Sequence, residues 1–323
     1  MGGAFLGCST SDEGEPVADG ATLRRELAIP HFRNPLKSEL IEQWNRRDLV
    51  LERVRFQGRF GDWIPGLVVY STLARTRPLP VIICMPGSPN IKEDLLAPMD
   101  LLPRWADRGF LVVSIDRPYH GDRVGDLQQA FREKGIVKVW GEYIYDLVRT
   151  IDYIQSRKEA DPERIGILGL SMGGAEALLL GAIDERIDVV VSVAGHLAWK
   201  EIFSAEAWKV IFRGLGLRHR LVRLGAEADE AHRAFQEQYP SLGLVDATKV
   251  APMLAGKPLL LVVGSEDPYM PTEASRSTFK AALVAYTELG MEDHLEFWEV
   301  PGVRHSFGYS MQERALAWFE RWL

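Results

Sequence analysis

One stretch of the sequence, residues 165–178, constrains the fold more than any other. An apolar run over residues 165–170 passes into Gly-x-Ser-x-Gly at residues 169–173, and helix-forming residues follow from Ala175 to Leu178. A turn this tight strains its central residue, Ser171, and tolerates only small neighbours, which Gly169 and Gly173 provide. The segment therefore predicts a buried strand, a sharp turn and a helix that packs back on the sheet.

The same alternation of short apolar runs and helix-period segments extends over the chain from residue 80 onward. The predicted strands are Val81–Met85, Phe110–Ile115, Ile165–Leu170, Val189–Val193, Leu259–Val263 and Leu295–Val300. The predicted helices lie near Leu95–Arg108, Trp140–Arg157, Ala175–Ala182, Thr272–Leu289 and Met311–Leu323. This pattern predicts an α/β fold with a mostly parallel central sheet and helices on both faces.

The N-terminal region has a different pattern. Residues 49–56 and 63–70 alternate on either side of a Gly-containing turn at 58–62, which predicts an antiparallel hairpin. Between Thr22 and Arg47, the spacing of the apolar residues suggests helix interrupted at Pro30 and Pro35.

The domain organisation predicted from these patterns is a flexible tail over residues 1–20 and one domain over residues 21–323. A helical insertion at about 196–257 is too long for a plain crossover. Its aromatic residues include Trp199 and Phe203, which serve either as a lid over a substrate pocket or as packing between the inserted helices.

Three residue types in a fixed order indicate nucleophilic catalysis. Ser171 is the candidate nucleophile, and an acid and a histidine are expected on loops after later strands. Asp267 follows the strand at 259–263 and His305 follows the last strand. The imidazole would accept the serine proton, and the carboxylate would hold its tautomer. Glu266 is the alternative acid, but its side chain would point the opposite way on an extended segment.

A serine nucleophile also needs backbone donors for the oxyanion. Met172 N–H, at the amino end of the helix after Ser171, is the first candidate. Ser88 N–H is the second, with Gly87 N–H as the fallback, because both follow the strand that ends at Met85.

A dense polar loop at residues 116–123 follows the next strand. Tyr119 and His120 from this loop are candidate substrate contacts. The competing interpretation is that Asp116, Arg117 and His120 form a hydrogen-bond network that fixes the loop.

Composition excludes several classes of partner. A net charge of −7 and a pI near 5.6 argue against a nucleic-acid partner. No apolar run approaches the length of a membrane span, and the histidines lack metal-ligand spacing, so no metal or other cofactor is expected. The oligomeric state is left open. We expect a cytoplasmic protein, with an exported lipoprotein tethered at Cys8 as the alternative.

With the Gly-x-Ser-x-Gly turn, the acid and the histidine in this order, residues 48–323 resemble the α/β-hydrolase superfamily. Segments 145–154, 161–165 and 171–174 resemble the dienelactone-hydrolase-like and acetyl-xylan-esterase-like branch, which borders the prolyl-oligopeptidase catalytic domain. That resemblance implies carboxylesterase or deacetylase activity without a cofactor. Ser171 stands where dienelactone hydrolases carry cysteine, which puts lactone specificity in doubt, and the propeller of the peptidases is not found here.

The expected function is therefore that of a serine carboxylesterase acting on small or short-chain acyl esters through an acyl-enzyme. A serine peptidase or acyltransferase of the prolyl-oligopeptidase-like branch would use the same three residues. A silent ligand-binding relative is disfavoured, because such proteins lose the serine, the acid or the histidine, and all three are present here.

Overall fold

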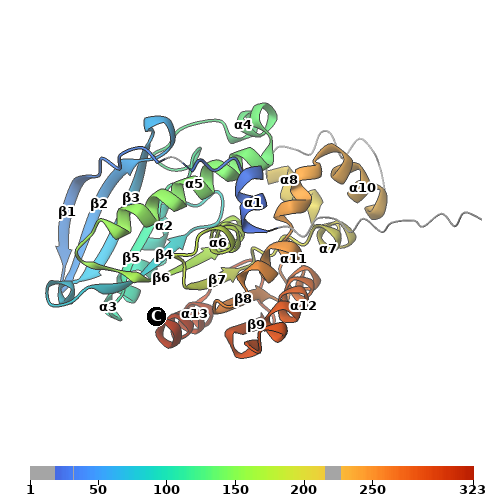
Figure 1. Cartoon of the computed structure of the whole chain (residues 1–323). Helices are drawn as coiled ribbons and strands as arrows, with labels where there is room; N and C mark the ends of the chain where they lie inside the picture. Colours follow the sequence, from blue (N-terminus) through green and yellow to red (C-terminus); the bar gives the residue numbers. More distant parts are fainter. Residues whose placement is uncertain (1–18, 32, 215–226) are drawn as a thin grey trace, which may run out of the picture.

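A nine-stranded sheet forms the centre of the computed structural model, which describes residues 19–31, 33–214 and 227–323 (Figure 1). The strand order across the sheet is β1-β2-β3-β5-β4-β6-β7-β8-β9. The strands are β1 (Glu39–Arg46), β2 (Leu49–Gln57), β3 (Trp63–Ser71), β4 (Leu79–Met85), β5 (Leu111–Ile115), β6 (Ala160–Leu170), β7 (Val189–Val193), β8 (Leu259–Gly264) and β9 (Leu295–Val300).

The helices lie between and around these strands. The α-helices are α1 (Gly20–Glu26), α2 (Lys92–Leu96), α3 (Leu101–Asp107), α4 (Leu127–Lys134), α5 (Ile136–Gln155), α6 (Met172–Ile183), α7 (Trp199–Ser204), α8 (Trp208–Gly214), α10 (Ala228–Gln238), α11 (Ala247–Val250), α12 (Thr272–Glu288) and α13 (Tyr309–Trp322). The short 3₁₀ segments are η1 (Arg59–Gly61), η2 (Thr72–Arg75), η4 (Pro240–Val245), η5 (Ala251–Leu254) and η6 (Glu292–His294).

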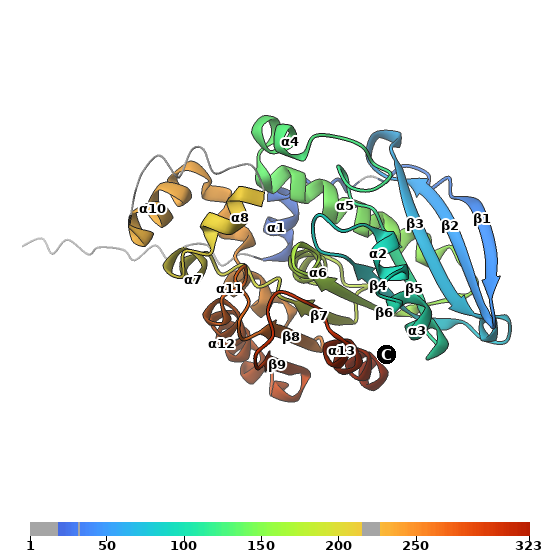
Figure 2. The same cartoon turned by 180° about the vertical axis from the view of Figure 1, so that it is seen from behind.

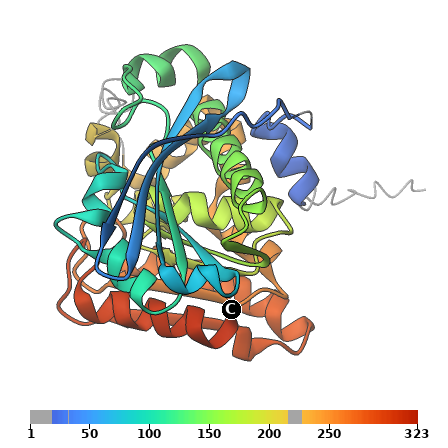
Figure 3. The same ribbon diagram turned by 90° about the vertical axis from the view of Figure 1, so that its left-hand side faces the viewer.

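Both faces of the sheet are covered, and the strand residues alternate between them. In β4, Val81 and Ile83 pack on the side of α5, α6 and α12, whereas Ile82 and Cys84 pack on the side of α3 and α13. Figure 3 shows this layering from the β1 side, and Figure 2 shows α3 and α13 in front of the sheet. Burial on both faces explains why these strands are continuous apolar runs, and it confirms the predicted fold class.

The six predicted parallel strands are present, and each pairs in parallel with its neighbours from β5 to β9. The predicted hairpin corresponds to β2 and β3, which pair antiparallel from Leu49 to Gln57. One predicted helix, Leu95–Arg108, is divided into α2 and α3.

The helix expected before residue 47 is wrong in its second half. Only Gly20–Glu26 is helical, and Leu40, Ile41 and Trp44 lie on the edge strand β1. Leu40 and Ile41 are more than half exposed, so their spacing does not mark a buried face. β1 is held instead by backbone pairing with β2 and by cross-strand ion pairs such as Arg53 to Glu42, 2.7 Å apart.

The insertion between β7 and β8 is helical, as expected, and contains α7, α8, α10 and α11 in its described part. Figure 1 shows these helices gathered at one end of the molecule, beside α1 and beyond the carboxyl ends of β6 and β7. Their aromatic residues pack together: the rings of Phe203 and Phe235 are 5.0 Å apart, and those of Trp199 and Phe212 are 6.4 Å apart.

The N-terminal predictions fall largely outside the described residues. Residues 1–18, with Cys8 and most of the expected tail, lie there, whereas Asp19 already caps α1 through a hydrogen bond from Thr22 N–H. Among the described residues, no helix is both long enough and apolar enough to span a bilayer.

Candidate active site

The turn after β6 has the backbone strain that the Gly-x-Ser-x-Gly pattern predicts. Ser171 has φ 55° and ψ −116°, and α6 begins at the next residue. A Cβ on residue 169 would lie 1.8 Å from the carbonyl oxygen of Gly173, and a Cβ on residue 173 would lie 2.5 Å from that of Met85. Both positions therefore require glycine, and the serine is left at the start of a helix.

An acid and an imidazole meet beside this turn. Asp267 follows β8 and His305 follows β9, and His305 Nδ1 lies 2.6 Å from Asp267 Oδ2. The other carboxylate oxygen of Asp267, Oδ1, accepts hydrogen bonds from the N–H groups of Tyr269 and Met270 at 2.8 and 2.9 Å. The side chain of Asp267 is fully buried, so its two oxygens are fixed in their directions.

Glu266, the alternative acid, does not occupy this position. It is exposed, whereas Asp267 is buried. The opposite directions of the two side chains place one toward His305 and the other toward solvent.

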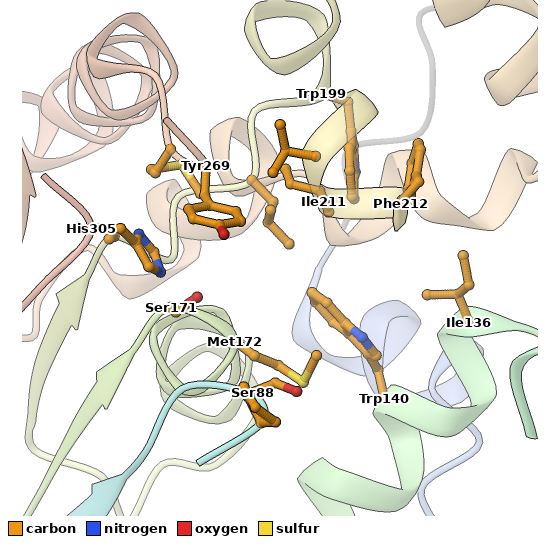
Figure 4. Close-up of a pocket in the computed structure, with 15 residues that line it drawn as sticks. Ser88, Ile136, Trp140, Ser171, Met172, Trp199, Ile211, Phe212, Tyr269 and His305 are labelled. Atoms are coloured by element: carbon orange, nitrogen blue, oxygen red, sulfur yellow. The ribbon is translucent and has the colours of Figure 1, made fainter. Parts of the chain in front are cut away.

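Ser171 and His305 line the same pocket, which has a volume of about 320 Å³. Figure 4 shows the imidazole of His305 pointing toward Ser171, with Tyr269 above it. The rings of Tyr269 and His305 are 4.8 Å apart, so Tyr269 limits the movement of the imidazole. The three residues predicted as nucleophile, acid and base therefore gather at one end of this pocket.

The loop after β4 lies against Ser171. A Cβ on residue 87 would be 3.2 Å from Ser171 Cβ, so Gly87 allows the loop to approach the turn closely. Ser88 and Met172 both line the pocket, and Figure 4 shows them close together on the same side of Ser171. Met172 is the first residue of α6, where backbone N–H groups have no partner within the helix.

Two residues of the polar loop at 116–123 make hydrogen bonds to the loop after β4. His120 Nε2 lies 2.9 Å from Ser88 Oγ, and its Nδ1 lies 3.0 Å from the carbonyl oxygen of Pro118. Arg117 donates a hydrogen bond to the carbonyl oxygen of Pro86 at 2.5 Å. Its Nε also lies 2.9 Å from a carboxylate oxygen of Glu176 on α6. Arg117 and His120 thus fix the loop after β4, as the alternative interpretation predicted, whereas Asp116 accepts hydrogen bonds from the N–H and the ammonium group of Lys92.

Removing one partner of the buried pair is expected to be costly. Arg117 and Glu176 are both at least 98% buried, and burial raises the pKa of Glu176 to about 7 against the opposing charge of Arg117. We expect Arg117→Met to lower the free energy of unfolding by about 3–5 kcal/mol, because a buried carboxylate loses its counter-ion. Urea unfolding measures this change. The double variant Arg117→Met/Glu176→Met should recover much of the loss; an equal loss in both variants would contradict the explanation.

The pocket wall differs from the one predicted. Trp199 lines the pocket, but Phe203 is buried in the aromatic cluster of the insertion, and His120 lies behind Ser88. Tyr119 faces a separate polar pocket and hydrogen-bonds to Glu142. Phe203, His120 and Tyr119 do not line this pocket, because the ring of Phe203 packs within the aromatic cluster and the polar groups of His120 and Tyr119 bind other residues of the protein.

The pocket residues that sequence reasoning missed are mostly apolar. They come from α5, α8 and the loops after β4, β7 and β8, and they are Pro89, Ile136, Trp140, Ala194, Leu197, Val210, Ile211, Phe212, Tyr269 and Met270. Position relative to Asp267 could have identified Tyr269 and Met270, which come directly after it in the chain. No local signal marks the first turn of α5 as part of the wall.

Comparison with known proteins places the chain in a family. The model of the family described as "Prolyl oligopeptidase family" matches residues 100–323, a range that includes Ser171, Asp267 and His305. The chain belongs to the prolyl oligopeptidase family. Membership confirms the predicted relationship to this group of α/β-hydrolases and the prediction of a serine hydrolase.

Curated relatives of this prolyl oligopeptidase family member include two Bacillus subtilis proteins. The chain is 28% identical over 246 residues to "Putative hydrolase YtaP", covering 72% of this chain and 73% of that protein. It is 26% identical over 271 residues to "Putative esterase YitV", covering 80% of this chain and 96% of that protein.

Solved structures with the same fold include two esterases. The acetyl xylan esterase from Paenibacillus sp. R4 superposes with a TM-score of 0.71 at 20% identity, covering 96% of each chain. The glucuronoyl esterase from Solibacter usitatus gives a TM-score of 0.67 at 13% identity, covering 96% of this chain and 95% of that one. At 20% and 13% identity, these superpositions show that this prolyl oligopeptidase family member and the two esterases share a fold.

A buried histidine near the site, His196, is hydrogen-bonded on both ring nitrogens to other residues of the protein. His196 lies after β7, where its Nε2–H donates to the carbonyl oxygen of Ser192 at 3.0 Å and its Nδ1 lies 2.8 Å from Ser275 Oγ. Complete burial lowers the pKa of His196 to about 4. The neutral ring is thus satisfied, and protonation would place an uncompensated charge in the core of this family member.

His196 is therefore expected to make the fold sensitive to acid. An unfolded histidine has a pKa of about 6.5, so below that pH the unfolded state binds the proton more readily and the stability from His196 is lost progressively toward pH 4. We expect the stability advantage of the parent protein over His196→Gln to shrink by about 3 kcal/mol between about pH 7 and pH 4. Urea unfolding of both proteins at the two pH values measures this difference; a constant advantage would contradict it.

Metal ligation has no candidate in the part of the chain that the structure describes, where no group of three or more His, Cys, Asp or Glu side chains could hold an ion. The thiol of Cys84 in β4 is buried, and burial raises its pKa.

Proposed function

We propose that this protein is a serine carboxylesterase that hydrolyses small carboxylic esters through an acyl-enzyme intermediate. The observation that carries the proposal is the 2.6 Å contact between His305 Nδ1 and Asp267 Oδ2, with His305 and Ser171 lining one pocket. The oriented imidazole can accept the proton of Ser171, which is otherwise a weak nucleophile.

Each residue has one role in the reaction. Ser171 Oγ attacks the ester carbonyl carbon while His305 Nε2 takes the hydroxyl proton. The tetrahedral intermediate collapses, the bond to the alcohol oxygen breaks, and His305 gives its proton to that oxygen. Water then attacks the acyl-enzyme with His305 as base, releasing the carboxylic acid and restoring the Ser171 hydroxyl. Asp267 stays ionised and stabilises the imidazolium that forms twice in this cycle.

The negative charge that develops on the carbonyl oxygen in the tetrahedral intermediate requires two hydrogen-bond donors. We assign the N–H groups of Met172 and Ser88, with Gly87 as the fallback for the second. The close approach of Gly87 to Ser171 supports this assignment, as does the position of Met172 at the first turn of α6. Arg117, through the carbonyl oxygen of Pro86, and His120, through Ser88 Oγ, keep the loop in place.

Ester hydrolysis is favoured over peptide cleavage by the relatives and by the pocket. One relative carries the name "Putative esterase", and the two structural neighbours described above are esterases. Among the described residues that line the pocket, none is an Asp, Glu, Lys or Arg that could bind the charged end of a peptide.

Labelling and turnover together test the function. A fluorophosphonate probe should label Ser171, and the purified protein should hydrolyse p-nitrophenyl butyrate while leaving an amino-acyl p-nitroanilide nearly untouched. Faster turnover of the anilide would favour the peptidase alternative. Absence of both labelling and ester turnover would overturn the proposed function.

A further inference from the structure

The pocket beside Ser171 has two chemically different ends. His305 and Tyr269 stand at one end, and Trp140, Ile136 and Phe212 stand at the other, with Met172 between them (Figure 4). Since His305 must give its proton to the leaving alcohol oxygen, the alcohol belongs on the His305 side. The acyl group must then extend from Ser171 past Met172 toward Trp140.

The far end is closed by ordered side chains. Ile136, Trp140, Trp199 and Phe212 are each at least 95% buried. Trp199 is held by a hydrogen bond from its indole N–H to the carbonyl oxygen of Leu242 at 3.2 Å, and its ring stacks on Phe212 at an angle of 18°. A wall held in this way sets a limit on the length of a bound chain.

The chemistry of this end selects neutral, apolar groups. Burying a carboxylate or ammonium group without a partner is costly, and no charged side chain is found among the described residues that line this end. The indole N–H of Trp140 is buried without a hydrogen-bond partner in the described part of the chain, so it can donate one hydrogen bond to an acyl-group oxygen but cannot neutralise a charge. Sugar hydroxyls and uronate groups would remain largely unsatisfied.

The size of the pocket exceeds what an acetyl group requires. Its volume of about 320 Å³ corresponds to roughly ten non-hydrogen atoms, if each takes about the space of one liquid water molecule. An ester of a six-carbon acid and a small alcohol has about this size. An acetyl ester would leave apolar wall uncovered.

Resting on the proposed carboxylesterase function, we propose that the Trp140 end of the pocket is the acyl site and that the substrates carry a neutral, apolar acyl group of intermediate length, from butyryl to octanoyl. Ile136 and Trp140 on α5 are specificity-determining residues that close the acyl site. The preference lies in the acyl group, while the alcohol is left toward His305 and Tyr269.

The test is a series of p-nitrophenyl esters from acetate to dodecanoate. Each added methylene should raise kcat/KM about fourfold, from the usual gain on burying one CH₂ group, until the site is full. Activity should then fall for dodecanoate. Highest activity on acetate, or on a glucuronate methyl ester, would overturn the inference while leaving the esterase function in place. Absence of turnover on every ester would overturn both.

Two opposite substitutions locate the end of the acyl site. Ile136→Trp should lower the hexanoate-to-acetate ratio of kcat/KM by at least about tenfold, and Ile136→Ala should move the best substrate to a longer chain. Neither should change the preference between methyl and butyl hexanoate. Val284→Trp, on an exposed position of α12, is the matched control and should leave all ratios unchanged. A change in alcohol preference instead of acyl preference would overturn the assignment, as would unchanged acyl ratios in both Ile136 variants.

Discussion

Replacing Ser171 with alanine is expected to lower kcat/KM for p-nitrophenyl butyrate by about a millionfold, because without the hydroxyl no acyl-enzyme forms. The fold should persist, since alanine and serine have the same difficulty at φ 55° and the glycines that shape the turn remain. Initial rates and circular dichroism of the purified variant measure both effects.

Ser38→Ala is the matched control for this variant. Ser38 is exposed beside the edge strand β1, and its loss should change neither rate nor stability. If Ser171→Ala kept more than a small fraction of the parent activity while folded, a different nucleophile would be at work.

The second large effect is expected from Asp267→Asn, at about ten-thousandfold in kcat. Asp267 Oδ1 is held by the N–H groups of Tyr269 and Met270, so the asparagine oxygen must take that place. The amide NH₂ then faces His305 Nδ1, which must accept a hydrogen bond, and the ring proton moves to Nε2. In that tautomer His305 cannot accept the proton of Ser171.

Glu266→Gln provides the comparison for this prediction. Glu266 is adjacent in sequence but exposed, and its neutralisation should leave kcat within about twofold, because exposed charges of this kind interact weakly with their surroundings. Steady-state kinetics with one ester series covers both variants. The reverse ranking of the two variants would make Glu266 the acid.

Where an element is buried on both faces, the sequence predicted it closely. β7 begins and ends at the predicted residues and β8 extends one residue further, because a run of apolar residues between turn-forming ones admits few alternatives. The meeting of Ser171, Asp267 and His305 was predictable for a related reason: they follow β6, β8 and β9, and parallel strands bring their carboxyl ends to one edge of the sheet.

The sequence was less informative about elements whose structure depends on contacts with other elements. Leu40, Ile41 and Trp44 have helical spacing but lie on β1, whose pairing with β2 joins Leu40 to Val54 and Trp44 to Leu51. Likewise Trp140 belongs to a long apolar helix, and only its meeting with the insertion makes it part of a pocket wall. Periodicity identifies the buried face of a helix but not the cavity that one of its turns borders.

The strand ends supply the proposed reacting groups, and the insertion supplies part of the pocket wall. This separation has a practical consequence. The proposed reacting groups lie after β6, β8 and β9, whereas α7 and α8, which supply part of the wall of the proposed acyl site, belong to the one insertion between β7 and β8. Exchanging that insertion for the corresponding one of a relative is expected to change one part of the acyl-site wall, while Ile136 and Trp140 on α5 and the proposed reacting groups stay in place. Substrate range within such a scaffold can therefore change in two separate steps, one in the insertion and one on α5.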